Sequence, residues 1–332
     1  MPNLSDIARE AGVSISTVSR ALRSDKRISE NTIKKVYEAA MITGYIKHIK
    51  NETVVMQNHE WMCIGIIVPE VISGYYARLV HLAAESFKKH DYLVTIRLTN
   101  FDHDTICRHV NDLCYSNVDC LLIIADDSEE VSGDIFSLVS GSGKPAFFIT
   151  SNYISNNDFD SLYIDERRGI DMLLEHLADK NYKKIGFIGE LQTIGRRDAY
   201  INSMKRLKLP INEKHIKIHN MRAEAGGYLA MQNMLAEKEY PDAVFFSYDQ
   251  MAFGGMKAIK EAGLTIPGDI AIAAFDDIII SEYIADGLTT VQSPCEDMIT
   301  IATRVLLSRV KDKNTAPQQI ALKPKLIVRG TT

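Results

Sequence analysis

The chain of 332 residues is 46% hydrophobic and 24% charged, which is typical of soluble globular proteins and excludes a disordered, collagenous or membrane-embedded chain. This length suffices for two or three domains. The formal net charge of −5 is unevenly divided, because residues 1–50 hold nine Lys and Arg against five Asp and Glu and so carry +4. The remaining residues carry −9, and this asymmetry indicates a basic, nucleic-acid-binding segment ahead of an acidic body.

The N-terminal sequence and the cysteines lead us to expect a cytoplasmic protein. The first ten residues, MPNLSDIARE, are polar and lack the apolar core of a signal peptide. Apolar runs fall short of the roughly 18 residues that a membrane span needs. The five cysteines are odd in number and form no C-x-x-C motif, so we expect free thiols in a reducing compartment, without a metal site or a cofactor.

Residues 4–22, LSDIAREAGVSISTVSRAL, predict two short helices around a tight turn. Asn3 and Asp6 are spaced for a capping box, Gly12 suits a turn that needs a positive φ, and Ser14 can cap the second helix. The apolar residues share one face of each helix, namely Leu4, Ile7 and Ala8 in the first and Val18, Ala21 and Leu22 in the second. This is the helix-turn-helix pattern, in which the second helix reads base edges in the DNA major groove. The alternative is an ordinary pair of packed surface helices.

A third helix is predicted from Ser29 to Gly44, with an apolar stripe of Ile33, Val36, Ala40 and Met41. Residues 46–60 show no periodicity and are interpreted as a linker. We therefore expect an all-α helix-turn-helix headpiece over residues 1–48, a hinge over 49–60 and a core over 61–332.

From residue 61 onward, short apolar strands alternate with amphipathic helices, which predicts parallel sheets covered on both faces. The predicted strands are 62–68, 92–98, 119–125, 145–150, 184–188, 215–219, 243–247 and 270–275. The predicted helices include 75–90, 166–179, 195–207, 225–237 and 250–262. This pattern is long for one sheet, so we expect an α/β core of two doubly wound parallel-sheet lobes, with ligands bound beyond the carboxyl ends of the strands.

Together these stretches resemble the LacI/GalR family of bacterial transcription regulators over essentially the whole chain. The resemblance is carried by DIAREAGVSISTVSRAL, ISENTIKKVYEAAMITGY, EHLADKNYKKIGFIG, RRDAY, SYDQMAFGGMKAIKEAGLTIPGDIAIAAFDD, LTTV and KLIVRGTT. It implies a periplasmic-binding-protein-like core with lobe 1 over about 61–160 and 291–322 and lobe 2 over about 161–290 and 323–332. The Tyr75–Tyr76 pair, the Arg196 stretch and the RGTT end look closest to regulators of β-galactoside operons.

The resemblance implies a repressor that binds palindromic double-stranded operator DNA as a homodimer. By this resemblance the subunits meet through helices 75–90 and 296–309, with Leu79, Leu82, Ala83, Ile299, Ala302 and Leu306. The implied DNA contacts are Leu4, Ser14, Ile15, Ser16, Thr17, Ser19, Arg20, Arg27, Ser29, Thr32 and Val54. Ile15 and Ser16 take the positions that select the operator in this family, where Ile packs on a thymine methyl and Ser donates or accepts. For Thr17, helix packing or phosphate contact remains an alternative to base reading.

The hinge departs from the family pattern. Glu52 brings a negative charge toward phosphates, and Val54 stands where the family has a Leu that wedges into the minor groove. These two residues predict a hinge that folds weakly.

By resemblance, the cleft that binds a sugar-like effector is formed by Pro69, Tyr75, Tyr76, Thr150, Arg196, Arg222, Tyr248 and Asp276. Arg196 and Asp276 offer a donor fork and an acceptor for neighbouring hydroxyl groups, and we expect them on opposite sides of the cleft. Arg222 stands where a stacking aromatic often lies, so it either favours a charged ligand such as a sugar phosphate or faces solvent. Tyr248 replaces a common Asn or Ser, and Asp249 is interpreted as a helix cap.

Two other classes of function make different demands on the sequence than a DNA-binding regulator does. A solute-binding protein of a transport system would carry an export signal and no headpiece. An enzyme would show a glycine-rich turn, a nucleophile with its base, or a carboxylate cluster, and the sequence contains no such arrangement, so no catalytic residue is predicted. A regulator that responds to a sugar phosphate or a purine stays open as an alternative.

Overall fold

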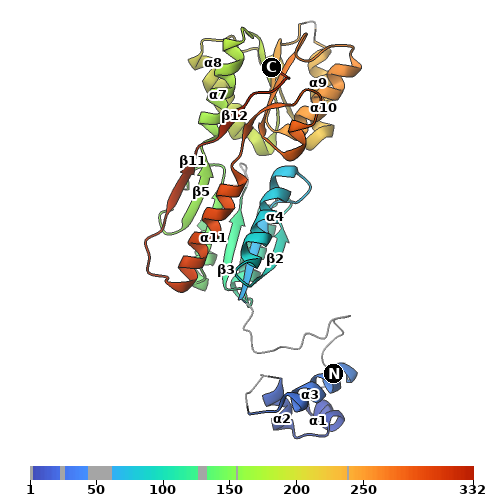
Figure 1. Cartoon of the computed structure of the whole chain (residues 1–332), viewed down its shortest axis with the longest axis vertical. Coiled ribbons are helices and arrows are strands. Elements are labelled where there is room, and N and C mark those ends of the chain that lie inside the picture. The colour runs from blue at the N-terminus through green and yellow to red at the C-terminus, as the bar shows by residue number, and fades with distance from the viewer. Residues whose placement is uncertain (1–2, 23–26, 44–61, 126–132, 155, 238) are drawn as a thin grey trace. The chain divides into compact units, whose positions relative to one another are not determined.

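The computed structural model describes residues 3–22, 27–43, 62–125, 133–154, 156–237 and 239–332. The chain divides into two compact units, Met1–Glu60 and Trp61–Thr332. The first unit contains the headpiece and the second contains the core (Figure 1). Gly44, Glu52 and Val54 lie outside the described residues, and so does the predicted hinge.

The headpiece consists of helices α1 (Leu4–Ala11), α2 (Ile15–Ala21) and α3 (Glu30–Ile42). The predicted capping box is confirmed, because Asn3 accepts from the backbone N–H of Asp6 while Asp6 accepts from the N–H of Asn3. Gly12 has a φ of +65°, which lets the chain turn without the cost that a Cβ would bring. Ser14 Oγ accepts from the N–H of Thr17 at 3.1 Å. The three helices share one small core of Ile7, Ala8, Val18, Ala21, Val36, Ala39 and Ala40.

The core contains two sheets, each of six strands, and each sheet defines one lobe (Figure 1). The strand order in lobe 1 is β11-β5-β4-β3-β1-β2, and every neighbouring pair is parallel. The strands are β1 (Met62–Val68), β2 (Tyr92–Leu98), β3 (Cys120–Ile124), β4 (Ala146–Thr150), β5 (Asp160–Ile164) and β11 (Gln319–Leu322). The helices of lobe 1 are α4 (Gly74–Lys88), α5 (His103–Cys114), α6 (Gly133–Ser142) and α11 (Cys295–Lys311).

Lobe 2 repeats this plan with the strand order β12-β10-β9-β8-β6-β7, in which only the β10–β12 pair is antiparallel among these neighbours. The strands are β6 (Ile185–Glu190), β7 (Ile216–His219), β8 (Ala243–Phe246), β9 (Ala271–Asp276), β10 (Thr289–Gln292) and β12 (Lys325–Ile327). The helices are α7 (Glu166–Asp179), α8 (Ile194–Arg206), α9 (Ala223–Leu235) and α10 (Asp249–Glu261). Figure 1 shows α7 and α8 on one side of this sheet and α9 and α10 on the other.

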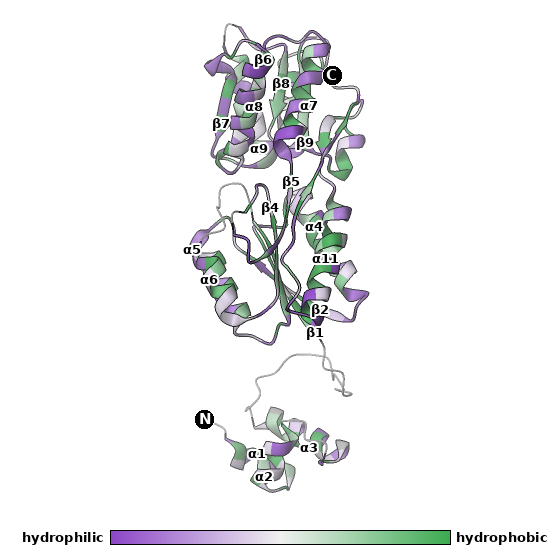
Figure 2. Cartoon of the chain, turned by 90° about the vertical axis from the view of Figure 1, so that its left-hand side faces the viewer, coloured by the Kyte–Doolittle hydropathy of each residue, from purple (hydrophilic) through white to green (hydrophobic). Residues whose placement is uncertain are grey.

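Alternating residues of each central strand serve two hydrophobic cores, because successive side chains point to opposite faces of a sheet. In β8, Val244 and Phe246 pack with α9 and α10, while Ala243 and Phe245 pack with α7 and α8. Lobe 1 is divided in the same way between α4 with α11 and α5 with α6. Figure 2 shows the resulting apolar character along central strands such as β4 and β8. These runs explain why the sequence predicts the central strands well.

Four strands escaped prediction, namely β5, β10, β11 and β12. They are polar or short. β5 begins at buried Asp160, which pairs with Arg309 at 2.8 Å, and β10 contains buried Thr289 and Thr290. Because tertiary partners satisfy these polar groups, the local sequence does not look like a buried strand. Lobe 1 consequently extends through Ile164, and lobe 2 contains all of β10, so the predicted boundaries at 160 and 290 are each a few residues wrong.

The residues that we expected at the subunit contact are mostly used inside lobe 1. Helices α4 and α11 pack against the same face of its sheet, and the hydrophobic core there contains Leu79, Ala83, Ile299, Ala302 and Leu306, each with at most 2% exposure. Leu82 is only partly buried against that core. A contact between subunits therefore needs other side chains than these five.

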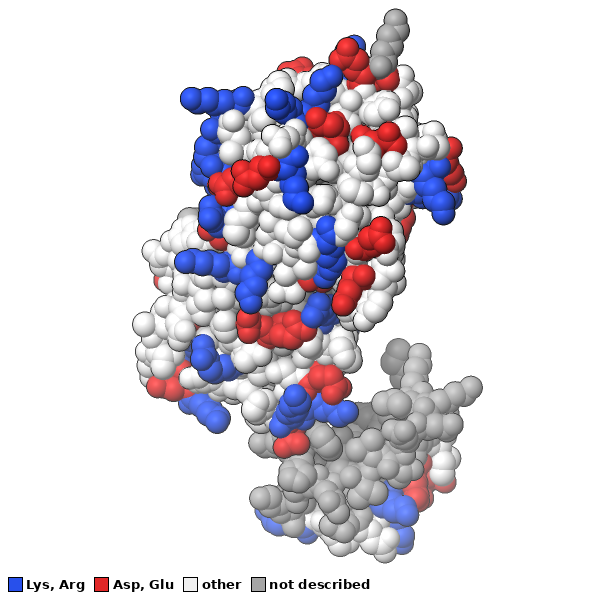
Figure 3. All heavy atoms as spheres, turned by 45° about the horizontal axis from the view of Figure 1, so that its top comes forward, with Lys and Arg blue, Asp and Glu red and all other residues white. Residues whose placement is uncertain are grey.

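The visible face of the core in Figure 3 intersperses Lys and Arg with Asp and Glu. Within the described part of the chain, no helix is both long enough and apolar enough to cross a membrane. The mixed charges on this face of the core contrast with the basic excess of residues 1–50.

Candidate functional site

A cavity lies between the two lobes of the core and is lined by polar and aromatic side chains. Its walls include the last residues of β4, β6 and β9, so the carboxyl ends of both sheets face it, as predicted for doubly wound sheets. The lining residues are Ser73, Tyr75, Tyr76, Phe101, Ala125, Ile149, Thr150, Ser151, Glu190, Gln192, Thr193, Arg196, Arg222, Tyr248 and Asp276.

Seven of the eight residues that the sequence assigned to the effector cleft line this one cavity. The eighth, Pro69, is buried at the end of β1 outside the lining, where its carbonyl accepts from the backbone N–H of Asn100 at 2.8 Å. The structure thus brings together residues from positions 75 to 276, drawn from both lobes.

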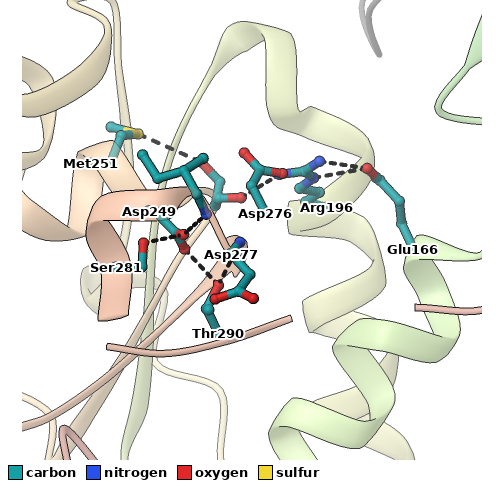
Figure 4. A network of polar contacts seen from close by, with 10 residues as sticks. Glu166, Arg196, Asp249, Met251, Asp276, Asp277, Ser281 and Thr290 are labelled. Atoms are coloured by element: carbon teal, nitrogen blue, oxygen red, sulfur yellow. Dashed lines mark hydrogen bonds and ion pairs between the residues drawn. The ribbon is translucent and has the colours of Figure 1, made fainter. Parts of the chain in front are cut away.

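Arg196 is the most heavily bonded side chain of the cavity wall (Figure 4). Its guanidinium donates to Glu166 Oε1 from Nη2 at 2.6 Å and from Nε at 3.1 Å. Nη1 donates to the carbonyl of Ser247 at 2.6 Å and to Asp276 Oδ1 at 3.3 Å. The guanidinium also lies 4.2 Å from the centre of the Phe275 ring. These contacts fix its orientation, because a buried charge is stable only when it is paired and hydrogen-bonded.

The expectation that Arg196 and Asp276 lie on opposite sides of the cleft is wrong, since the two form an ion pair. On the lobe 2 wall of the cavity they form a hydrogen-bond donor and a hydrogen-bond acceptor that are paired with each other. Two carboxylates, Glu166 and Asp276, share the one guanidinium. Burial raises the pKa of Asp276 above its ordinary value although Arg196 opposes this shift. The backbone of Asp276 has a φ of +109°, a strained conformation of the kind that clusters at functional sites.

The interpretation of Asp249 as a helix cap is also wrong. The residue before α10 in the capping position is Tyr248, and Asp249 is fully buried at the first position of the helix. Its carboxyl accepts from the backbone N–H of Ile278 at 2.9 Å, from Ser281 Oγ at 2.6 Å and from Thr290 Oγ1 at 2.5 Å (Figure 4). Burial raises the pKa of Asp249 to about 7 despite these hydrogen bonds. Asp249 therefore ties α10 to the chain that leaves β9.

Arg222 and Tyr248, the two departures from the family pattern, contact the same buried carboxylate. Arg222 Nη1 lies 2.7 Å from Glu190 Oε1, and the Tyr248 hydroxyl donates to Glu190 Oε2 at 2.9 Å. The same hydroxyl accepts from the backbone N–H of Ala223 at 2.7 Å. Burial raises the pKa of Tyr248, which keeps the hydroxyl protonated as a donor. Glu190, Arg222 and Tyr248 thus form one group around a single buried carboxylate, which we call the Glu190 trio. Arg222 Nη1 is within ion-pair distance of this carboxylate but makes no hydrogen bond to it.

Aromatic residues of lobe 1 form a row along the opposite wall. The rings of Tyr75 and Tyr76 are 5.1 Å apart, and those of Tyr76 and Phe101 are 6.1 Å apart, all in edge-to-face arrangements. The guanidinium carbon of Arg222, from lobe 2, lies 3.9 Å from the centre of the Phe101 ring, a cation–π contact. Asn100 and Phe101 both have φ between +50° and +60°, which is unusual for residues with a side chain. This contact joins the two lobes at the cavity.

Sequence reasoning missed Glu166, Glu190 and Phe101. Glu190 could have been found, because it comes two residues after the predicted strand 184–188 and the carboxyl ends of such strands line the ligand site. Glu166 starts a predicted helix, and Phe101 follows β2. Only the fold shows that these two side chains reach Arg196 and Arg222 respectively.

In the headpiece, the candidate DNA contacts fall into two groups. Ile15, Ser16 and Arg20 are exposed on α2, and Ile15 exposes 51% of its surface although it is hydrophobic. Most of the other candidates contact neighbouring residues of the headpiece. Leu4 packs on the headpiece core, Ser14 contacts Ser16 and Thr17, and Ser29 accepts from the N–H of Thr32. Ser19 is half-buried and Arg27 is exposed. An ordinary surface helix does not need an exposed hydrophobic side chain such as Ile15 at its start.

Comparison with known proteins matches both units of the chain. Residues 3–48 match the family model described as bacterial regulatory proteins, lacI family, and residues 174–332 match a periplasmic binding protein-like domain. The HTH-type transcriptional repressor PurR of Haemophilus influenzae (strain PittEE) is 29% identical over 343 residues, which cover 99% of this chain and 98% of that protein.

Two solved structures share the fold over the whole chain. The complex of the transcriptional regulator CelR with cellobiose has a TM-score of 0.70 and 20% identity, and the match covers 100% of both chains. The lac repressor dimer bound to operator and the anti-inducer ONPF has a TM-score of 0.72 and 23% identity, and the match covers 100% of this chain and 99% of that chain.

The buried carboxyl of Asp249 predicts a dependence of stability on pH. An exposed Asp titrates near 3.9, so between about pH 4 and pH 7 the folded chain holds a proton that the unfolded chain has lost. The free energy of unfolding should therefore fall as pH rises through this window, by at most about 4 kcal/mol from this group. Asp249→Asn keeps the shape and cannot ionise, so urea unfolding at pH 5 and pH 8 should show a smaller loss than in the wild type. Asp134→Asn, at an exposed position of α6, is the control. Equal losses in wild type and Asp249→Asn would contradict the assignment.

Proposed function

We propose that the chain is a DNA-binding transcriptional regulator of the LacI family of bacterial regulatory proteins rather than an enzyme, and that it is a cytoplasmic repressor controlled by a small sugar-like effector bound between the two core lobes. The observation that carries this proposal is the cavity, which joins polar groups of lobe 2 to an aromatic row of lobe 1 in a chain that also holds a helix-turn-helix headpiece. A transport-type solute-binding protein would have no use for that headpiece.

The walls of the cavity suit a polyhydroxylated ligand. Arg196 and Asp276 offer a fixed donor and acceptor to adjacent hydroxyl groups, and Thr150 and Gln192 add further polar groups nearby. The faces of Tyr75 and Tyr76 provide apolar surface for the C–H groups of a sugar ring. The related fold of CelR in its cellobiose complex supports a sugar as the effector.

An effector in this cavity would contact both lobes at once, so it would favour one arrangement of the lobes over another. Only its difference in affinity for the two arrangements can change the DNA affinity.

We propose that α2 enters the major groove, with Ile15 and Ser16 on base edges and Arg20 on a base or phosphate. The proposal includes further residues that either contact the DNA or position α2, namely Leu4, Ser14, Thr17, Ser19, Arg27, Ser29 and Thr32. It also includes Val54 as a DNA contact of the hinge. Exposure of Ile15 supports a role in contacting a thymine methyl.

The choice of operator should depend on Ile15 and Ser16. Exchanging both residues for the pair of another family member should change the preferred operator, at about 1–3 kcal/mol for each affected base pair. Selection of binding sites from a randomised DNA pool measures this preference. Lys34→Ala, at an exposed position of α3, should instead weaken all sequences alike. An unchanged preferred site after the exchange would refute the assignment.

We also propose a homodimer, as in the lac repressor structure that shares this fold. Hydrophobic side chains are exposed on edge strand β2 (Leu93, Ile96, Leu98) and near the lobe boundary (Ile72, Ile279, Tyr283), and Ile72, Ile279 and Tyr283 each expose more than 70%. Large exposed apolar groups of this kind mark association surfaces. The predicted contacts at α4 and α11 would then involve only the outward faces of those helices.

The dimer predicts a specific loss of association. Ile96→Lys combined with Leu93→Lys should place like charges at the contact between copies and shift sedimentation from dimer to monomer at micromolar concentration. Tyr115→Lys, at another exposed hydrophobic residue, should remain dimeric. A wild-type chain that sediments as a stable monomer would overturn the proposal.

Asp276 should govern the response to the effector. Asp276→Ala removes an acceptor from a desolvated cavity and should weaken binding of the effector by about 1–3 kcal/mol, while operator affinity without effector stays close to wild type. The effector would be the sugar that binds tightest in a calorimetric screen that includes cellobiose. Operator binding is then titrated with this sugar for the wild type, Asp276→Ala and the control Asp134→Ala. An unchanged midpoint in Asp276→Ala would show that the effector binds elsewhere.

A further inference from the structure

Both arginines that line the cavity are already ion-paired within the protein. Arg196 pairs with Glu166 and Asp276, and Arg222 pairs with Glu190. Arg222 is the more exposed of the two, with 31% of its side chain accessible, so it is the cation that an anionic ligand would reach first. Its partner Glu190 has a side chain only 2% exposed and so cannot turn away into water.

Arg222 is held from a second side as well. Its guanidinium stacks on Phe101 at 3.9 Å, so the ion pair and the stacking together fix its position. A ligand phosphate at Arg222 would either break the ion pair with Glu190 and leave a buried carboxylate without its cation, or share the guanidinium and lie next to the negative charge of that carboxylate. Both arrangements are unfavourable.

The first N–H group of helix α9 is also taken by the same group. Arg222 is the N-cap residue of α9, and a helix N-terminus favours anions through its unpaired backbone N–H groups. Here the first N–H of the helix, that of Ala223, donates to the Tyr248 hydroxyl, which in turn donates to Glu190. The Glu190 trio thus pairs the guanidinium with a carboxylate and takes the first N–H of the helix, and it places a negative charge beside both.

We propose that Glu190 is the specificity-determining residue that restricts this cavity to uncharged effectors and excludes their phosphorylated or carboxylated forms. The inference deepens the proposed function, since it names the charge class of the ligand for the same cavity. The sequence left two roles open for Arg222, a contact to a ligand phosphate or a side chain that faces solvent. In this proposal Arg222 has neither role. Its charge is used internally, and Glu190 is the residue responsible.

The test is a gain of anion binding when Glu190 loses its charge. Inorganic phosphate is titrated into the full chain by calorimetry in a phosphate-free buffer at pH 7.5. Glu190→Gln keeps an acceptor for the Tyr248 hydroxyl but frees the Arg222 charge, and we expect it to bind phosphate about tenfold to a hundredfold more tightly than the wild type. Glu190→Ala, which frees Arg222 without an isosteric side chain, should gain affinity in the same direction.

Two controls separate this effect from a change in net charge. Glu213→Gln makes the same charge change at an exposed position of lobe 2 and should bind phosphate as the wild type does. The double variant Glu190→Gln, Arg222→Met should lose the gain. The proposal is overturned if neither Glu190 variant binds phosphate more tightly than the wild type, or if the double variant keeps the gain. Because the titration uses neither sugar nor operator, its result is independent of whether a sugar controls DNA binding.

Discussion

The pairing of one buried guanidinium determines how lobe 2 meets the cavity. Arg196 comes from the first turn of α8, and its partners come from α7, from the end of β9 and from the chain that follows β8. A buried charge without partners would cost several kcal/mol, so these four elements are stable together only when their ends meet at this point. The same contacts fix the donor and acceptor that face a ligand. Stability of the lobe and geometry of the site therefore depend on one set of bonds.

The pattern of apolar residues was sufficient to predict the two doubly wound lobes, because the central strands are buried on both faces and carry hydrophobic runs. It was not sufficient for β5 and β10, where Asp160, Thr289 and Thr290 are buried but satisfied by distant partners. Asp249 was misinterpreted for the same reason. An Asp ahead of a helix usually caps it, whereas this one bonds to Ser281 and Thr290, more than thirty residues away along the chain.

The cavity between the lobes shows both the strength and the weakness of transferring residues from a family one at a time. Seven of eight transferred positions line a single cavity. Arg222 and Tyr248 looked anomalous individually, and neither suggested its partner, because Glu190 was absent from the transferred set. Their identities make physical sense only together, since a cation pairs with the buried carboxylate and a neutral hydroxyl donates to it. These three residues therefore have to be considered together rather than one position at a time.

The contact between Arg222 and Phe101 has a kinetic consequence. It joins the two lobes through side chains of the protein itself, so it supplies part of the attraction between them. Separation of the lobes has to break this contact, so a ligand whose entry required that separation would be limited by how often the contact breaks. At high ligand concentration the observed binding rate would level off at the opening rate instead of rising in proportion, and that plateau would report the lifetime of the closed protein.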